Sequence, residues 1–229
     1  MVTGTKLNPE ELNKIHLDVL PEKTRGAFLL CASLPFFSQG GWYLAGGTAL
    51  ALHAGHRQSV DLDFFTAETE FDQKKIEETL AATGEWKTTS LDKGTVYGEL
   101  KGAKISLIAY PYFKIAGQFT KIGHVAIAQP ADIAAMKITA ISQRGKRRDF
   151  IDLYWISKNI QPLLKSIESV AIQYSVPQNQ SHILKSLVYF DDAEGDPMPT
   201  LLFKATWQDI KKYFQSEAPR IAKQIMGLE

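Results

Sequence analysis

The chain has 229 residues, 45% of them hydrophobic, and a formal net charge of +1. This length supports one large domain or two small ones with a substantial apolar core. The balanced charge excludes a uniformly basic surface, so any contact with nucleic acid must come from local patches.

Three features of the sequence indicate a cytoplasmic protein without a membrane partner. The only cysteine, Cys31, can form no internal disulfide, and a thiol in an apolar run usually packs as a small apolar group. The apolar run over residues 27–37 spans 11 residues and contains Pro35, so it is too short to cross a bilayer. The N-terminus also lacks the pattern of a signal peptide.

Helices are predicted before the first strand. A helix over residues 9–20 has Asn8 as its cap and Pro9 at its first position, and a second helix is predicted over residues 22–37. Residues 42–45 then predict a short apolar strand, and residues 48–53 predict another helix.

Gly46 and Gly47 lie at this turn from strand to helix. Glycine allows positive φ and a close approach of the backbone to a ligand, and the first N–H groups of a helix attract phosphate. Thr48 either donates its hydroxyl to a phosphate or caps the helix. A tight turn without a ligand is the ordinary alternative for paired glycines.

Two carboxylates follow on one strand. In residues 59–65, Asp61 and Asp63 project from the same face because strand side chains alternate, while Leu62 and Phe64 face the core. Neighbouring carboxylates repel each other unless a cation neutralises them, and Mg²⁺ (or Mn²⁺) is usually held by one or two carboxylates with substrate phosphates. We therefore predict a metal site at Asp61 and Asp63, the alternative being an acidic, solvent-facing strand edge.

The remaining elements are a helix, further strands and then helices. A helix is predicted over residues 71–82, and strands over residues 86–91, 95–100, 104–109 and 124–128. From Pro130 the periodicity is helical, with a pair of helices over residues 131–144 and 147–158, then three or four more helices interrupted by a turn-rich segment at 191–197. We predict an α+β protein, with a mixed-sheet domain over residues 1–129 and a helical domain over residues 130–229 that completes the active-site cleft.

Other polar residues near the glycines and aspartates have two possible roles. Arg57 and Ser59 either contact phosphates or brace the strand, Arg57 through an ion pair. His53 and His56 have no second ligand partner in sequence, so we expect structural roles and no zinc site.

These motifs resemble those of a known enzyme family. The run Gly46-Gly47-Thr48-Ala49-Leu50, then Arg57, Ser59 and Asp61-Leu62-Asp63, is similar to the first motif of the nucleotidyltransferase AbiEii/AbiGii toxin family, within the DNA polymerase β-like nucleotidyltransferase superfamily. A second stretch, residues 130–137, then Arg144 and residues 146–154, resembles the family's helical Lys…Arg…Asp motif. The resemblance implies a polymerase β-like mixed sheet with flanking helices, and a nucleoside triphosphate as substrate.

The resemblance also implies roles for the second motif. The family's functional lysine and aspartate fall on Lys137 and Asp149, the lysine supplying positive charge to a triphosphate or the transition state, and Asp149 orienting or deprotonating the acceptor. Asp152 is an accessory candidate unless Arg148 pairs with it at i,i+4. The basic run 146–148 either grips RNA phosphates or is simply exposed.

One position departs from the superfamily pattern. Many members carry a third metal-binding acid on a later strand, and the best-aligned strand here, residues 104–109, places Ser106 at that position. A hydroxyl cannot replace a carboxylate as a metal ligand. Either one metal suffices, helped by an acid such as Asp149 or Glu99, or the chemistry is weak or lost.

The leading hypothesis is a Mg²⁺-dependent nucleotidyltransferase that moves a nucleoside monophosphate from a nucleoside triphosphate to an acceptor hydroxyl. The resemblance implies a toxin of a toxin–antitoxin or abortive-infection system, with tRNA or another RNA as the expected acceptor and a cognate antitoxin protein as the expected partner. One alternative is a catalytically inactive nucleotide-binding protein that acts through a partner. Another is a transferase that modifies antibiotics or proteins on the same scaffold.

Overall fold

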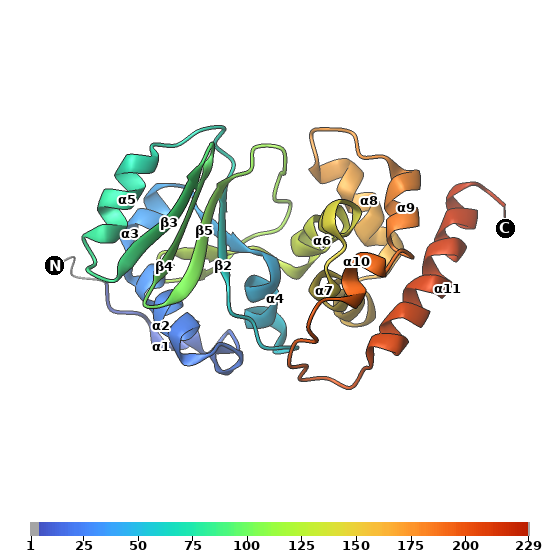
Figure 1. Ribbon diagram of the computed structural model, residues 1–229, viewed down its shortest axis with the longest axis horizontal. Helices are drawn as coiled ribbons and strands as arrows, with labels where there is room; N and C mark the ends of the chain where they lie inside the picture. Colours follow the sequence, from blue (N-terminus) through green and yellow to red (C-terminus); the bar gives the residue numbers. More distant parts are fainter. Residues whose placement is uncertain (1–4, 229) are drawn as a thin grey trace. The chain divides into compact units, whose positions relative to one another are not determined.

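The computed structural model describes residues 5–228 and divides into two compact units, one reaching to Gln129 and the other starting at Pro130. The strands of the sheet all belong to the first unit, and the second unit is helical (Figure 1). Each unit has its own apolar core, so the two are described separately.

A seven-stranded mixed sheet forms the first unit. Its strands are β1 (Tyr43–Ala45), β2 (Leu62–Thr66), β3 (Trp86–Asp92), β4 (Thr95–Leu100), β5 (Ala103–Ala109), β6 (Thr120–Ile122) and β7 (Val125–Ile127), in the spatial order β3-β4-β5-β2-β1-β7-β6. The pairs β2·β5 and β1·β7 are parallel, and the other neighbouring pairs are antiparallel. The predicted mixed sheet is thus confirmed, although the prediction missed β6.

The two faces of this sheet differ in burial. Leu44, Leu62 and Leu107 are fully buried on one face, where they form part of the apolar core. Residues paired in register on neighbouring strands share a face, and alternate residues of a strand take opposite faces. The opposite face therefore carries Asp63 together with Ser106, its register partner.

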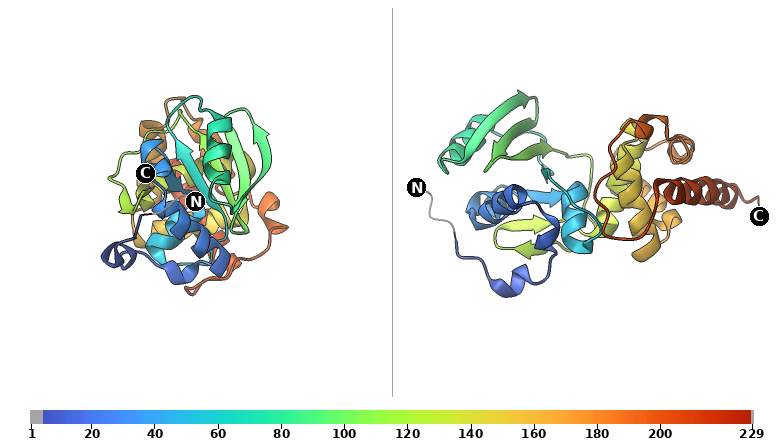
Figure 2. Two further views of the ribbon diagram at one scale, coloured as in Figure 1. Left: turned by 90° about the vertical axis from the view of Figure 1, so that its left-hand side faces the viewer. Right: turned by 60° about the horizontal axis from the view of Figure 1, so that its bottom comes forward.

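Helices accompany the sheet in the first unit, as Figure 2 shows. They are α1 (Pro9–Leu12), α2 (Glu22–Ser33), α3 (Pro35–Gln39), α4 (Gly46–Ala54) and α5 (Gln73–Ala81). Helix α2 contacts β5, α3 contacts β7, α4 contacts β1 and β2, and α5 contacts β3.

Two of the predicted helices are interrupted in the structure. The helix predicted over residues 9–20 is replaced by α1 and the one-turn 3₁₀ helix η1 (Leu17–Val19), because the backbone N–H of His16 donates to the carbonyl of Leu52 instead of continuing a helix. The helix predicted over residues 22–37 ends at Ser33 because Leu34 is extended before Pro35. Proline disfavours helical geometry in the residue before it but begins a new helix easily, which explains the start of α3.

Over its described residues, 130–228, the second unit contains the helices α6 (Pro130–Arg144), α7 (Arg147–Asn159), α8 (Leu163–Gln173), α9 (Gln180–Ser186), α10 (Asp191–Glu194) and α11 (Trp207–Ile225). Gly145, with a φ of +52°, makes the tight turn between α6 and α7, the predicted helical pair. Phe150 lies at the centre of the core, with its ring centroid 5.1–5.9 Å from those of Phe190, Trp207 and Phe214. The predicted turn-rich segment opens with the one-turn helix α10.

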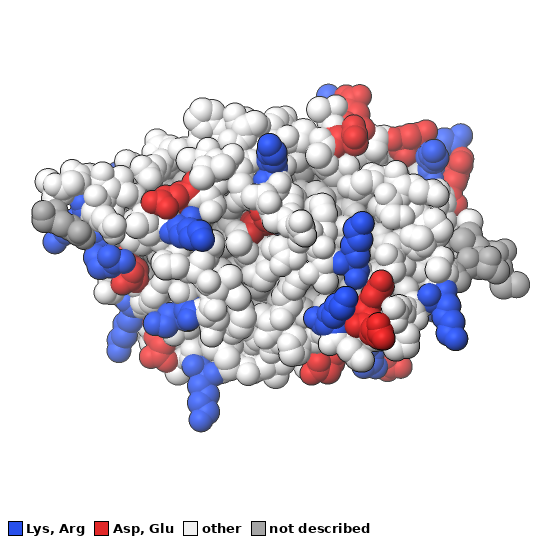
Figure 3. All heavy atoms as spheres, turned by 180° about the vertical axis from the view of Figure 1, so that it is seen from behind, with Lys and Arg blue, Asp and Glu red and all other residues white. Residues whose placement is uncertain are grey.

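Charge and hydropathy on the surface agree with the composition. Basic and acidic side chains are interspersed over the face seen in Figure 3, as the net charge of +1 suggests. Within residues 5–228, no helix combines the length and the apolar character needed to cross a membrane.

Candidate functional site

Gly46 makes the turn that leads from β1 into α4. Its φ is +70°, a conformation that is easy for glycine and costly for other residues. A Cβ atom at this position would lie 3.3 Å from Oδ2 of Asp63, so the backbone here closely approaches that carboxylate. The first N–H groups of a helix have no partner within the helix, which makes the Gly46-Gly47 turn a source of donors for a phosphate.

Asp61 and Asp63 lie on one side of their strand. Asp63 belongs to β2 and Asp61 directly precedes it, and both residues are half-buried. Leu62 and Phe64, which alternate with them, are fully buried. The two carboxylates therefore project from the face that Gly46 approaches, and this donor set fits Mg²⁺ held by carboxylates and phosphate oxygens.

Ser106 of β5 is the register partner of Asp63. Neighbouring strands are about 4.8 Å apart and register partners share a face, so the Ser106 side chain lies beside Asp63. Throughout residues 5–228, no group of three or more His, Cys, Asp or Glu side chains is arranged to hold a metal ion. Asp61 and Asp63 thus have a hydroxyl rather than a third carboxylate as their neighbour on β5.

Thr48 and Ser59 hold the backbone next to Asp61. The buried Thr48 hydroxyl lies 2.8 Å from the Ser59 hydroxyl and is hydrogen-bonded to the backbone carbonyl of Asp61. Because a carbonyl can only accept, Thr48 donates to Asp61 and Ser59 donates to Thr48. Thr48 does not cap α4, whose N-cap residue is Ala45. The hydroxyl therefore has a use that the sequence analysis did not consider, which is to position Asp61.

Arg57 and two histidines are packed near this segment. Arg57 is only 4% exposed, and its guanidinium Nη1 donates to the carbonyl of Gln58 at 2.9 Å. His56 is buried, and His53 Nε2 lies 3.0 Å from the carbonyl oxygen of Ala128, to which it donates. Burial lowers the pKa of His53, and the Ala128 hydrogen bond partly opposes that effect. These placements are consistent with structural roles for both histidines.

The residues of the second motif form a buried ion cluster in the second unit. Nζ of Lys137 on α6 lies 2.7 Å from Oδ1 of Asp149 and 2.7 Å from Oδ2 of Asp152, both on α7. Nε of Arg144 lies 3.2 Å from Oδ2 of Asp149. Lys137 is 4% exposed and the two aspartates 0%, whereas the Arg144 side chain is 52% exposed. The i,i+3 spacing of the aspartates places both carboxylates toward Lys137.

Ion pairing outweighs burial in setting the charge of Asp149. Burial alone would raise the pKa of this carboxyl, but the charges of Lys137 and Arg144 and the hydrogen bond from Lys137 hold it below its ordinary value of 3.8. Asp149 is therefore ionised at neutral pH. Asp152, for which Arg148 was a possible partner, forms an ion pair with Lys137 of the neighbouring helix.

Part of the basic run 146–148 is tied to the segment around α10. Nζ of Lys146 lies 3.3 Å from Oδ1 of Asp196. The guanidinium of Arg147 donates to the carbonyls of Ala193 and Glu194 and lies 5.1 Å from the ring centroid of Trp207. Arg147 thus contributes to packing of the second unit, a role that spacing alone did not predict.

Aromatic side chains lie on the strands next to the aspartates, and two of them, Tyr43 and Phe65, were not among the predicted site residues. Phe65 follows Asp63 by two residues on β2, and its ring centroid lies 5.9 Å from that of Tyr43 on β1 in a stacked arrangement. Tyr110 meets Phe65 edge-on at 5.6 Å. The two-residue alternation that identified Asp61 and Asp63 extends to Phe65, so the same signal could have found it.

Comparisons with known proteins agree with this architecture. The profile of the family described as nucleotidyl transferase AbiEii toxin, type IV TA system, matches residues 29–122 and 104–224. An uncharacterized protein of Aquifex aeolicus is 34% identical over 177 residues, which cover 76% of this chain and 84% of that relative.

Two solved structures share the fold. A candidate nucleotidyltransferase from H. pylori has a TM-score of 0.53 at 17% identity, with 91% of this chain and 99% of that chain covered. MenT4, a nucleotidyltransferase toxin from Mycobacterium tuberculosis, has a TM-score of 0.50 at 16% identity, with 88% and 89% covered. The predicted polymerase β-like nucleotidyltransferase fold is therefore confirmed, and the chain belongs to the AbiEii nucleotidyltransferase toxin family of type IV toxin–antitoxin systems.

Proposed function

We propose that this protein is a Mg²⁺- or Mn²⁺-dependent nucleotidyltransferase that moves a nucleoside monophosphate from a nucleoside triphosphate to an acceptor hydroxyl. One observation carries the proposal: the carboxylate of Asp63, which shares its face with Asp61, lies against the backbone of Gly46 at the start of α4. A phosphate bound at this helix start would meet two carboxylates, and a divalent cation relieves the repulsion between them.

Positioning and charge neutralisation would supply the catalysis. The acceptor oxygen attacks the α-phosphorus and loses its proton, the bond from that phosphorus to the bridging oxygen breaks, and pyrophosphate leaves. Asp61 and Asp63 would hold the metal, which when bound reduces the negative charge at the reacting phosphate. The N–H groups at Gly46 and Gly47 would bind phosphate oxygens, while Thr48 fixes the backbone of Asp61.

In the second unit, Lys137 is proposed as a fixed positive charge that the reaction requires. Two carboxylates at 2.7 Å hold its ammonium group in place. A carboxylate with a lowered pKa is a weak proton acceptor at neutral pH. The ion pairs of Asp149 therefore favour a positioning role for this residue over the general-base role that the sequence analysis considered.

Ser106 supports a second candidate function, a nucleotide-binding protein that does not turn over and acts through a partner. A hydroxyl at the register position next to Asp63 leaves the carboxylate pair without a third acid there, which weakens the case for a two-metal reaction. Nucleotide binding at Gly46 and the aspartates would still be retained.

The family extends the first proposal to a biological role. We infer a cytoplasmic toxin with a cognate antitoxin protein as partner, and tRNA or another RNA as acceptor. The family's type IV toxin–antitoxin description and the toxin MenT4 among the structural neighbours support the toxin role.

A label-transfer experiment tests the proposed function. The protein would be incubated with Mg²⁺, cellular RNA and each nucleoside triphosphate labelled at the α-phosphate, and binding of the same nucleotides would be measured by calorimetry. Label in RNA supports the transferase. Nucleotide binding without label in any molecule supports the inactive alternative, and the absence of both refutes the nucleotide site.

A further inference from the structure

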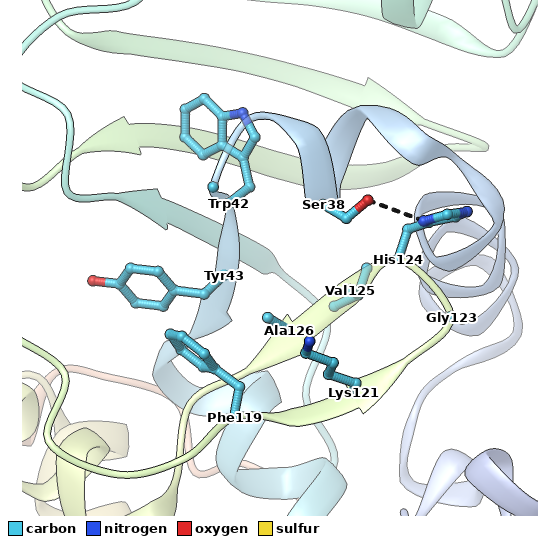
Figure 4. Close-up of a pocket in the computed structure, with 10 residues that line it drawn as sticks. Ser38, Trp42, Tyr43, Phe119, Lys121, Gly123, His124, Val125 and Ala126 are labelled. Atoms are coloured by element: carbon cyan, nitrogen blue, oxygen red, sulfur yellow. Dashed lines mark hydrogen bonds between the residues drawn. The ribbon is translucent and has the colours of Figure 1, made fainter.

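An open cavity of about 220 Å³ lies in the first unit at the β6 edge of the sheet (Figure 4). We call it the Phe119 cavity. Its aromatic lining residues are Trp42, Tyr43 and Phe119, and its polar ones are Ser38, Lys121 and His124. Tyr43 also stacks on Phe65 beside Asp63, and the other five residues have no role in the site described above.

Three lining residues of the Phe119 cavity lie on the sheet face that carries Asp63. Tyr43 is the register partner of both Phe65 on β2 and Ala126 on β7, and Ala126 is the partner of Lys121 on β6. These residues therefore share a face, and Asp63 lies on it two residues before Phe65. With about 4.8 Å between strands and about 3.3 Å per residue, Tyr43 is on the order of 8 Å and Lys121 on the order of 16 Å from Asp63 along the sheet.

The lining fits one flat ring system with a negatively charged group attached to it. Phe119 is 36% exposed and is backed by the buried Tyr43, with ring centroids 5.5 Å apart. Lys121 is an exposed cation, and no carboxylate is among the described residues that line the cavity. Pockets for drug-sized ligands usually measure about 300–1,000 Å³, so this smaller cavity suits a single ring system.

Hydrogen bonds hold the walls of the Phe119 cavity in place. The two ring nitrogens of His124 lie 3.0 Å from the Ser38 hydroxyl, the contact drawn in Figure 4, and 3.1 Å from the Thr5 hydroxyl. The side-chain amide of Gln129 donates to the carbonyl of Gln118 and to the Thr120 hydroxyl, on either side of Phe119. Such bracing lowers the cost of ordering the aromatic wall around a ligand.

We propose that the Phe119 cavity binds a purine or pyrimidine base by stacking on Phe119, with the attached phosphate toward Lys121. This proposal rests on the proposed function for the identity of the ligand, since a transferase of this kind handles bases in both its nucleotide donor and an RNA acceptor. Aromatic stacking accepts any base, and a neighbouring cation tracks its phosphate.

Binding measurements without metal test the proposal separately from catalysis. The donor probes are the nucleoside triphosphates, with inorganic triphosphate as the base-free control; the acceptor probe is a short single-stranded RNA, with an abasic strand as its control. The variants are Phe119→Ala and Lys121→Gln. Lys87→Gln serves as a matched control because Lys87 is an exposed lysine on β3, the opposite edge strand of the same sheet.

The wild type is expected to bind one or both base-containing probes more tightly than their base-free controls. Phe119→Ala is expected to weaken that binding about tenfold, Lys121→Gln to weaken it severalfold, and Lys87→Gln to leave it unchanged. A loss confined to the triphosphates assigns the cavity to the donor, and a loss confined to RNA assigns it to the acceptor. If neither variant weakens either probe, or if the base adds no affinity, the proposal is overturned.

Failure of this proposal is distinguishable from failure of the proposed function. If the wild type transfers label and both cavity variants bind the probes normally, the proposed transferase function stands and the proposed base site is refuted. If base binding depends on Phe119 but the protein labels no acceptor, the proposed base site stands and the proposed transferase function is refuted.

Discussion

Replacing Lys137 with methionine is expected to destabilise the protein by about 3–5 kcal/mol, the usual cost of removing one partner from a buried ion pair. The burial of this ion cluster puts the expected loss of stability at the high end of the range for single substitutions. Asp149 and Asp152 have no exposure, and each loses a contact of 2.7 Å to the ammonium group. Arg144 still reaches Asp149 at 3.2 Å and offsets part of the loss. Because domains are stable by only about 5–15 kcal/mol, the variant is expected to be marginal.

The assay is urea unfolding at neutral pH, followed by circular dichroism, with a matched triple variant. Adding Asp149→Asn and Asp152→Asn to Lys137→Met removes the two negative charges that Lys137 balances in the wild type, so most of the lost stability should return. A loss below about 1 kcal/mol in the single variant would refute the buried cluster as its cause. So would a triple variant no more stable than the single one. Activity of any Lys137 variant must therefore be corrected for its folded fraction.

Three further predictions concern single residues. Gly46→Ala forces alanine into a left-handed conformation and places its Cβ against Asp63. The free energy of unfolding in urea should therefore fall by about 1–2 kcal/mol, and label transfer should also fall. Unchanged values for both would contradict the close approach of Gly46 to Asp63. The pKa of Asp149 is lowered in the folded state, so the unfolded state binds more protons in acid, and the free energy of unfolding should fall as the pH drops below about 5. Asp149→Asn should flatten this pH dependence, and an equally steep fall in the variant would contradict the role given to Asp149. In the absence of Mg²⁺, Ser106→Asp should lower stability because the new carboxylate is repelled by Asp63. The same variant should bind Mg²⁺ more tightly in calorimetry, and weaker binding would show that this position does not face the metal.

Local sequence patterns predicted much of the fold because many elements are determined by residues within a short stretch of the chain. The alternation around Asp63 predicted the buried and half-buried faces of β2, and Gly145 separates the two predicted helices. The prediction failed where a distant contact decides the backbone. Residues 9–20 have a helical pattern, but His16 donates to Leu52, a residue far along the chain. No local window contains that information.

The candidate site was predicted in part for the same reason. Asp61 and Asp63 lie on one strand, so the two-residue period alone places their carboxylates together. The ion pair between Asp152 and Lys137 was not predictable from spacing because Lys137 lies on another helix, and their contact depends on how α6 packs on α7. The hydroxyl of Thr48 likewise bonds to the backbone near Asp61, across a loop whose path the sequence does not specify.

The central claim is that Asp61 and Asp63 together hold the metal for nucleotide transfer. The most direct test is transfer of label from α-labelled nucleoside triphosphates in the presence of Mg²⁺, comparing the wild type with the double variant Asp61→Asn, Asp63→Asn. Asparagine keeps the size of each side chain, so the variant should fold, as circular dichroism would verify, and its labelling of RNA should fall to background. Labelling by the folded double variant at the wild-type rate would contradict the claim.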